Sequence, residues 1–276
     1  MYGMNDTEYV AFVDTTRDEL RDRMDEARQR FYRLARSADP NARRSGLDWT
    51  VQQVVAHVLC IAHRYQALAE GRDFHRASHP RELDRINQEE LEAVMAPIPE
   101  LVDQIEAIAS VMDAYFDDLS NVDSSIEFHC GIMISGIVMQ INWLFELVLH
   151  GEDIARAVGT PWEIRERDML LLLREVMEVA PAYLRAEISR ATDICVALEI
   201  PDARPYVMHV HDGIAELRDR RPADRPDAVL KLPASTMVRM LLKRIGPFTA
   251  VRHGLRIVGG RRPWKALKLQ SCFETA

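Results

Sequence analysis

Apolar residues recur every three or four positions through the first half of the chain, which is the spacing of helices with one buried face. One such stripe, from Leu20 to Leu34, predicts a helix over residues 16–36. The same spacing predicts three further long helices, over residues 49–70, 99–119 and 131–158. We therefore expect a mainly α N-terminal domain that is built as a four-helix bundle.

Local signals mark where several of these helices begin and end. Thr50 and Gln53 fit the capping box at the start of the second helix. Gly159, which is followed by Thr and Pro, is the stop signal expected after the fourth. Residues 72–97 are polar and irregular, so they predict a loop with one short helix around residues 89–94.

The pattern changes in the last third of the chain. A helix over residues 168–190, bounded or interrupted near Pro181, is followed by short segments with the alternation of strands. Strands are expected over residues 194–200, 206–210, 214–217, 228–232 and 255–258, and helices over 235–245 and 263–273. Asp212-Gly213 between two strands is a strong hairpin signal. We therefore predict a bundle over residues 1–180 and a smaller α+β domain over residues 181–276.

The charge of the chain is divided unevenly along it. Residues 1–192 hold 20 Lys and Arg against 34 Asp and Glu (net −14), whereas residues 193–276 hold 15 against 9 (net +6), which together give the overall charge of −8. Two domains of different composition account for this asymmetry. The basic residues of the second part are scattered rather than gathered in a patch, so no nucleic-acid partner is expected.

Two features bear on the cellular compartment. The apolar stretch from Gly131 to Leu149 is long enough to span a membrane, but it contains Glu146 and other polar residues, so a buried bundle helix explains it better. The four cysteines are dispersed, with no Cys-x-x-Cys pair, and no secretory signal opens the chain. We expect free thiols, a cytoplasmic protein and no membrane partner.

Three residues carry the candidate chemistry. Glu146 and His150 are four positions apart in the fourth helix, so they share one face, and His57 lies on the second helix. Two imidazoles and one carboxylate can hold a divalent ion and leave positions open for chemistry. Asp153 could orient an imidazole ligand without binding the metal itself. The spacing alone also fits a buried Glu–His pair that binds no metal, with His57 unrelated to it.

The sequence motifs around these residues resemble those of a known family. The run Trp49-Thr50-Val51 with Val54, Val55 and His57, and the run Glu146-x-x-x-His150-x-x-Asp153 ending in Gly159 and Pro161, are similar to two signatures of the DinB-like metal-binding bundles. More narrowly, they resemble the mycothiol-dependent maleylpyruvate isomerases. The tail, from Ala228 to Leu267, resembles the sterol-carrier-type C-terminal domain that such proteins often carry.

The resemblance implies a metal-dependent enzyme that uses a low-molecular-weight thiol. His57, Glu146 and His150 would hold the metal, with Zn²⁺ the first choice and Fe(II) the alternative. Mycothiol or a similar thiol would be the cosubstrate, acting on a small, activated, anionic substrate. Loss of the thiol after bond rotation gives an isomerase, and retention of the thiol gives an S-transferase. The protein would act as a monomer or a homodimer.

The substrate site departs from the family pattern. Relatives often have an arginine four residues before the metal-binding glutamate, where this chain has Asn142. An asparagine cannot make the bidentate, charged contact to a carboxylate that an arginine makes, so a dicarboxylate substrate is in doubt. Arg261 and Arg262, beside Trp264, are weaker candidates for binding an anion; the alternative is a core tryptophan with solvated arginines.

A function of another class also fits the sequence. The C-terminal domain could bind an apolar ligand, with a metal site that is structural or vestigial. Removal of the metal separates the two hypotheses, because it would abolish activity in an enzyme but cost stability in a binding protein.

Overall fold

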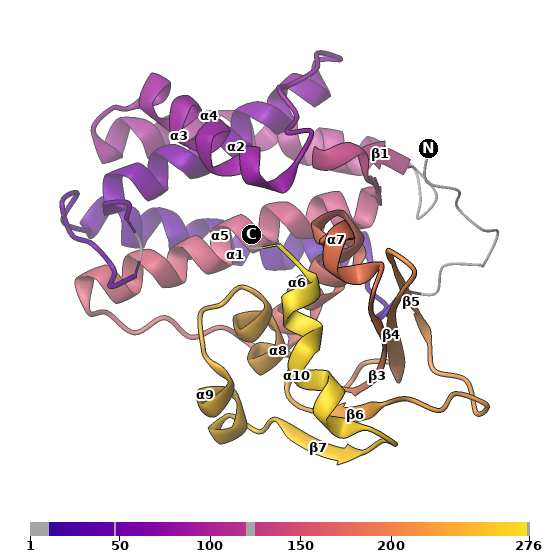
Figure 1. Cartoon of the computed structure of the whole chain (residues 1–276). Coiled ribbons are helices and arrows are strands. Elements are labelled where there is room, and N and C mark those ends of the chain that lie inside the picture. Colours follow the sequence, from indigo (N-terminus) through magenta and orange to yellow (C-terminus); the bar gives the residue numbers. More distant parts are fainter. Residues whose placement is uncertain (1–10, 47, 120–124, 275–276) are drawn as a thin grey trace. The chain divides into compact units, whose positions relative to one another are not determined.

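The structure, a computed structural model, describes residues 11–46, 48–119 and 125–274 (Figure 1). It divides into two compact units, one formed by Thr15–Asp168 and the other by Met169–Ala276 with the segment up to Asp14. The first unit is helical and the second combines a sheet with short helices, so the predicted fold class is confirmed.

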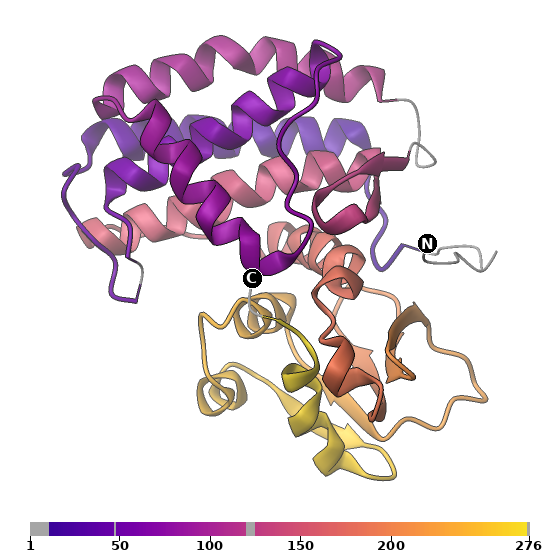
Figure 2. The same ribbon diagram turned by 45° about the horizontal axis from the view of Figure 1, so that its top comes forward.

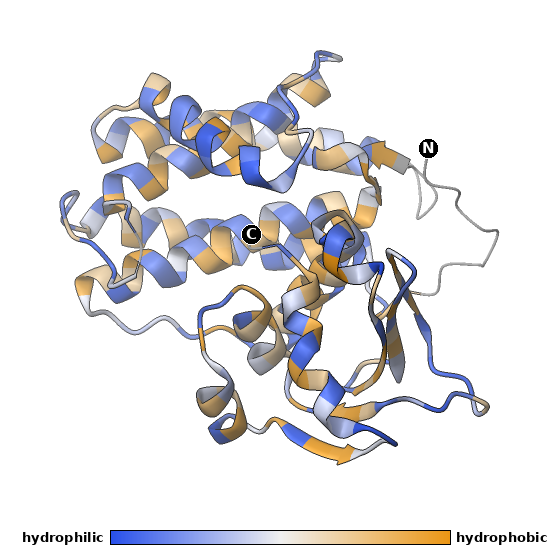
Figure 3. Cartoon of the chain, in the orientation of Figure 1, coloured by the Kyte–Doolittle hydropathy of each residue, from blue (hydrophilic) through white to orange (hydrophobic). Residues whose placement is uncertain are grey.

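The first unit is a bundle of four long helices, whose arrangement can be followed in Figures 1 and 2. They are α1 (Arg17–Ser37), α2 (Val51–Ala69), α4 (Ile98–Asp118) and α5 (Gly136–Val158). Helix α1 packs beside α5 and helix α2 beside α4, while α2 also contacts α5. Helix α3 (Pro80–Val94) packs on the outside of α2. Apolar and polar positions alternate around these helices (Figure 3), as expected for one buried face each.

The helix boundaries follow from capping residues. Thr16 and Thr50 accept hydrogen bonds from backbone N–H groups in the first turns of α1 and α2, and the capping box with Gln53 is complete. Helix α5 ends at Gly159, which has a left-handed φ of 69° that glycine adopts without strain.

Two predictions about the extent of helices in the first unit were wrong. Residues 80–94 form a full helix, which looks polar in the sequence because only Pro80, Ile86 and Leu91 of it are buried. The fourth helix begins at Gly136 rather than at residue 131. Cys130 and Gly131 both have left-handed backbones, which a right-handed helix cannot contain. Strands β1 (Ser125–Glu127) and β2 (Met133–Ser135) pair there instead, around the short turn η1 (His129–Gly131).

Helix α5 is buried along nearly its whole length. Its residues Gly136–Leu144 are all buried, and so are the polar side chains of Asn142, Glu146 and Asp153 further along. Along the described parts of the chain, no helix combines the length and apolar character needed to cross a membrane. The apolar stretch of the sequence is therefore a bundle helix that carries one polar stripe.

The second unit is built around a five-stranded sheet in the order β5-β4-β3-β6-β7. The strands are β3 (Asp193–Glu199), β4 (Tyr206–His211), β5 (Ile214–Asp219), β6 (Ala228–Lys231) and β7 (Arg256–Gly259). Strands β3 and β6 are parallel, and the other neighbours are antiparallel. All five predicted strands are present, and the turn at Asp212-Gly213 joins β4 to β5 as expected.

The helices of the second unit are shorter than the sequence predicts. Helix α6 (Glu166–Val179) ends in two short turns, η2 (Ala180–Tyr183) and α7 (Ala186–Ser189). Helix α8 (Ala234–Leu241) is followed by an unforeseen α9 (Pro247–Arg252), and the expected closing helix is three short turns, η3 (Pro263–Lys265), α10 (Ala266–Leu269) and η4 (Gln270–Cys272). Most of α6 belongs to this unit, so the division lies before the boundary expected at residue 180.

Candidate metal centre

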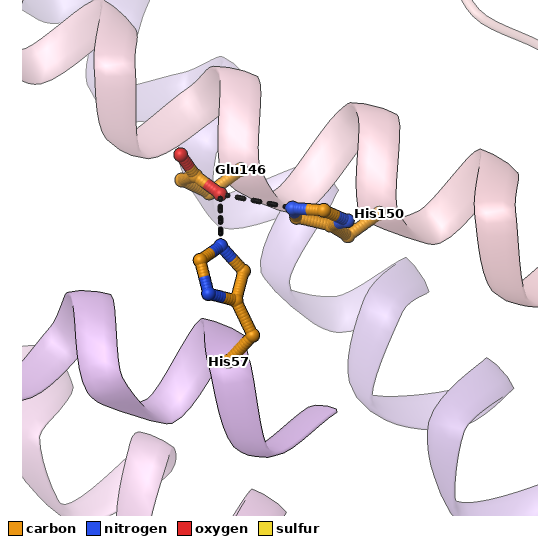
Figure 4. A group of neighbouring side chains, drawn as sticks. All are labelled: His57, Glu146 and His150. Carbon is orange, nitrogen blue, oxygen red and sulfur yellow. Dashed lines mark ion pairs between the residues drawn. The ribbon is translucent and has the colours of Figure 1, made fainter. Parts of the chain in front are cut away.

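Two bundle helices bring the three predicted ligands together. His57 comes from the middle of α2, whereas Glu146 and His150 lie one turn apart on α5 (Figure 4). His57 Nε2 lies 3.6 Å from Glu146 Oε2, and His150 Nε2 lies 3.1 Å from the same oxygen. One ligand atom from each residue lies within 4.8 Å of the others, which is close enough for a single ion. The fold therefore places His57 beside Glu146 and His150, which sequence spacing alone could not do.

The cluster is largely buried and packs against an aromatic ring. His57 is 5% exposed and Glu146 is 9% exposed. The Trp49 ring lies 4.9 Å from the His57 ring, and the two imidazoles are 5.0 Å apart in an edge-to-face arrangement. His57 Nδ1 is buried and has no hydrogen-bond partner among the described residues. Packing against Trp49 and the contact of Nε2 with Glu146 therefore hold this ring.

His150 has a carboxylate beside its ring. Its Nδ1 lies 3.2 Å from Asp153 Oδ2, which leaves Nε2 directed at Glu146. Asp153 is 2% exposed and makes a short ion pair with Arg44, from the loop before α2. A carboxylate behind a ligating histidine fixes the ring orientation and increases its basicity.

Burial and ion pairing act in opposite directions on the charges of the cluster. Burial lowers the pKa of His57 below its ordinary value and so favours the neutral ring. Burial also opposes charge on His150, but the hydrogen bonds with Asp153 and Glu146 outweigh it and raise its pKa to about 9. Burial would raise the pKa of Glu146, but the two imidazoles hold it below its usual range. In the metal-free protein a protonated His150 therefore neutralises Glu146.

The donor set fits a divalent metal. Two imidazole nitrogens and one carboxylate oxygen converge on one point, and the carboxylate is already ionised. A catalytic zinc site uses three protein ligands of this kind and keeps a further position for water or substrate. The same two-histidine, one-carboxylate set suits Fe(II). Because a ligating imidazole must be neutral, binding requires His150 to lose its proton.

The remaining predicted site residues have partners of their own. Asn142, one turn before Glu146 on α5, is buried, and its Oδ1 accepts a 2.6 Å hydrogen bond from the Tyr65 hydroxyl. Arg261 and Arg262 belong to the second unit, where Arg262 Nε donates to Asp227 Oδ1 at 2.7 Å.

The alternative that Trp264 is a core residue is wrong, because this side chain is 62% exposed.

Sequence reasoning missed the residues that support the cluster from outside the two ligand helices. Arg44 lies in a loop and has no periodic pattern, so nothing in the sequence connects it to Asp153. Trp49 stood in the matched run, but its contact with His57 depends on the packing of the loop before α2. The sequence offers Arg156 as a local partner for Asp153, but in the structure Arg156 pairs with Glu152, so no sequence signal pointed to Arg44.

Fold and site together define a class: a helical bundle with a His–Glu–His cluster in its core, joined to a small α+β unit. Residues 24–155 match the family model described as the mycothiol maleylpyruvate isomerase N-terminal domain, and this range includes His57, Glu146, His150 and Asp153. Over these residues the helical unit is therefore similar to that family's N-terminal domain.

Solved structures agree on the fold. The chain resembles the crystal structure of the mycothiol-dependent maleylpyruvate isomerase, with a TM-score of 0.53 and 16% identity, over 84% of this chain and 90% of that one. A variant of that enzyme with one histidine replaced by alanine gives the same TM-score at 14% identity, again over 84% and 90% of the two chains. At such identities the likeness shows the fold alone. A search of curated proteins found no match.

Proposed function

We propose that this protein is a metal-dependent enzyme that uses a low-molecular-weight thiol, such as mycothiol, to isomerise a small activated substrate. The observation that carries the proposal is the convergence of His57, Glu146 and His150 inside the domain that matches the isomerase family. The named isomerase supplies the reaction type, and maleylpyruvate is the first substrate to test.

His57, Glu146 and His150 would hold the metal, with Zn²⁺ first and Fe(II) second. A divalent ion lowers the pKa of a thiol or water that it binds, so it supplies a nucleophile near neutral pH. In the reaction, a carbon–sulfur bond forms when the thiolate adds to the substrate double bond. The resulting single bond rotates, and the carbon–sulfur bond then breaks to regenerate the thiol. Retention of the carbon–sulfur bond would make the same protein a thiol transferase.

The chain's own residues prepare the site in three ways. Asp153, paired with Arg44, fixes the ring of His150 so that its Nε2 faces Glu146. Trp49 packs against His57, and burial lowers the pKa of this ring and favours its neutral form. The four cysteines are free; Cys60 and Cys272 are buried, and burial raises the pKa of each thiol, which disfavours a protein thiolate as nucleophile. A small external thiol therefore suits the site better.

The test combines metal content with turnover. We would measure Zn and Fe by elemental mass spectrometry and follow maleylpyruvate isomerisation with mycothiol and other thiols, in the wild type and in His57→Ala. His75→Ala is the matched control, because His75 is an exposed histidine of the same unit. We expect thiol-dependent turnover in the wild type; His57→Ala should lose that turnover together with about one equivalent of metal, and His75→Ala should keep both.

Other outcomes decide between the alternatives. A stoichiometric thiol adduct that accumulates would identify a transferase. A metal whose removal lowers the melting temperature, in a protein inactive with every thiol, would favour a structural site and a ligand-binding protein. No metal after reconstitution would overturn the proposal.

A further inference from the structure

A second group of potential metal ligands lies on the sheet of the other unit. His209 and His211 are two positions apart on β4, so their side chains share one face of the sheet. Glu216 of β5 is the register partner of His209, and Asp193 of β3 is the register partner of His211. Three strands therefore place two imidazoles and two carboxylates on one face.

The donors are close enough to serve one ion. The two imidazole rings are 4.2 Å apart and inclined by 35°. One ligand atom each from His209, His211 and Glu216 lies within 4.8 Å of the other two. His209 Nε2 lies 2.9 Å from Asp193 Oδ1, and His211 Nε2 lies 4.0 Å from Glu216 Oε2.

The surroundings favour a cation. Asp193, Glu216 and Asp212, whose Oδ2 lies 3.2 Å from His211 Nδ1, add negative charge around the rings. The nearest arginine, Arg218, is held by two 2.8 Å hydrogen bonds to Asp224, although its Nε also lies 3.4 Å from Glu216. Lys265 donates to the backbone carbonyl of Asp193 and lies 3.3 Å from Asp227. Arg218 is thus directed mainly at Asp224, and Lys265 at a backbone carbonyl and Asp227.

We propose that His209, His211 and Glu216 form a second, solvent-accessible binding site for a late divalent transition metal, with Asp193 as an additional ligand or as the partner that orients His209. The two imidazole donors favour Zn²⁺, Ni²⁺ and Cu²⁺ over Mg²⁺ and Ca²⁺. The ion would link β3, β4 and β5 across the sheet. The site lies entirely in the second unit, so it does not depend on the function proposed for the bundle.

The experiment isolates this site by removing the first one. Zn²⁺ would be titrated calorimetrically into metal-free His57→Ala protein, in which we expect about one remaining equivalent. Adding His211→Ala should abolish that equivalent. Adding His253→Ala, which changes an exposed histidine of the same unit outside the cluster, should leave it unchanged. Thermal melting provides a second readout, because Zn²⁺ should raise the melting temperature only while the cluster is intact.

A direct measurement avoids any dependence on the folding of the variants. Substoichiometric Cu²⁺, which is paramagnetic, should broaden the imidazole resonances of His209 and His211 in the intact protein before that of His253. The proposal is overturned if His57→Ala protein takes up no Zn²⁺, if uptake survives His211→Ala, or if Cu²⁺ leaves the two resonances sharp. Failure of the bundle site would appear separately, as unchanged metal uptake on His57→Ala.

Discussion

The helical unit and the sheet unit each carry two histidines and a glutamate within reach of one ion, but they present them differently. In the bundle the donors come from two helices far apart in sequence and lie among buried side chains, whereas on the sheet they come from one hairpin and face solvent.

Although the two clusters contain the same types of ligand, they differ in how strongly they need a bound cation. Inside the bundle, the ionised Glu146 must be neutralised either by a protonated His150 or by a metal, because an unpaired buried charge is very costly. On the sheet, water can solvate each carboxylate, so a metal is optional there. Burial and fixed orientation, rather than ligand identity, make the bundle cluster the candidate for catalysis.

The largest effect is expected from removing a buried ligand. Glu146→Gln should reduce thiol-dependent turnover by more than about 100-fold, because loss of a residue that only supports a ligand already costs about 10–100-fold. Glu216→Gln on the sheet should leave turnover unchanged. Initial rates with metal added in excess would measure both effects. Equal losses of activity in the two variants would contradict the assignment of catalysis to the bundle cluster.

Removing the support behind a ligand should have the next largest effect. Asp153→Asn should weaken metal binding in the bundle by about 10–100-fold, because His150 loses the carboxylate that orients it. Asp212→Asn, the corresponding change beside His211, should alter Zn²⁺ affinity by less than about 3-fold, because its side chain is 90% exposed and screened by water.

Competition with a chromophoric chelator would measure both affinities. Glu152→Gln, which changes the neighbouring buried carboxylate that pairs with Arg156, is the control for general damage to α5. Equal losses in Asp153→Asn and Glu152→Gln would mean that Asp153 has no specific role in orienting His150.

Acid sensitivity should separate buried from exposed imidazoles within the helical unit. His129 Nδ1 accepts a 3.0 Å hydrogen bond from the Ala77 N–H, and burial, helped by Arg64 and Arg76, lowers its pKa to about 3. The unfolded chain takes up a proton first, near pH 6.5, so stability is complete above that pH and falls as the pH drops toward 3. The loss should reach about 2 kcal/mol between pH 6.5 and 5.

Urea unfolding followed by fluorescence of the buried Trp143 would measure this slope. His129→Asn, which keeps a hydrogen-bond acceptor without the titration, should flatten it. His75→Asn, at an exposed position of the same unit, should not. An unchanged slope in His129→Asn would show that another group governs the acid response.

The smallest effect tests the packing that fixes α5. A Cβ added at Gly151 would lie 2.2 Å from Cζ2 of Trp162, so Gly151→Ala must displace this ring, whose Nε1 donates to the Val148 carbonyl. We expect a net destabilisation of about 1 kcal/mol, as overpacking outweighs the better helix propensity of alanine. A melting curve would measure it. Trp162→Leu in the same background should recover most of the loss, and Zn²⁺ binding on the sheet should be unaffected.

The sequence by itself determined the class of each unit and the metal ligands to test. Periods of three to four residues and the capping residues located α1, α2, α4 and the end of α5, and strand alternation located β3 to β7. Glu146 and His150 were certain to share a face once α5 was recognised, because that spacing is a local property of a helix. These signals succeed because they depend on neighbours a few residues away.

Only the tertiary structure decided which distant groups meet. It brought His57 to Glu146 and Arg44 to Asp153, and it aligned Asp193, His211 and Glu216 across three strands. It also showed a full α3 and the late start of α5. Such pairings depend on packing and strand register between segments far apart in the chain, and no local pattern of residues records them.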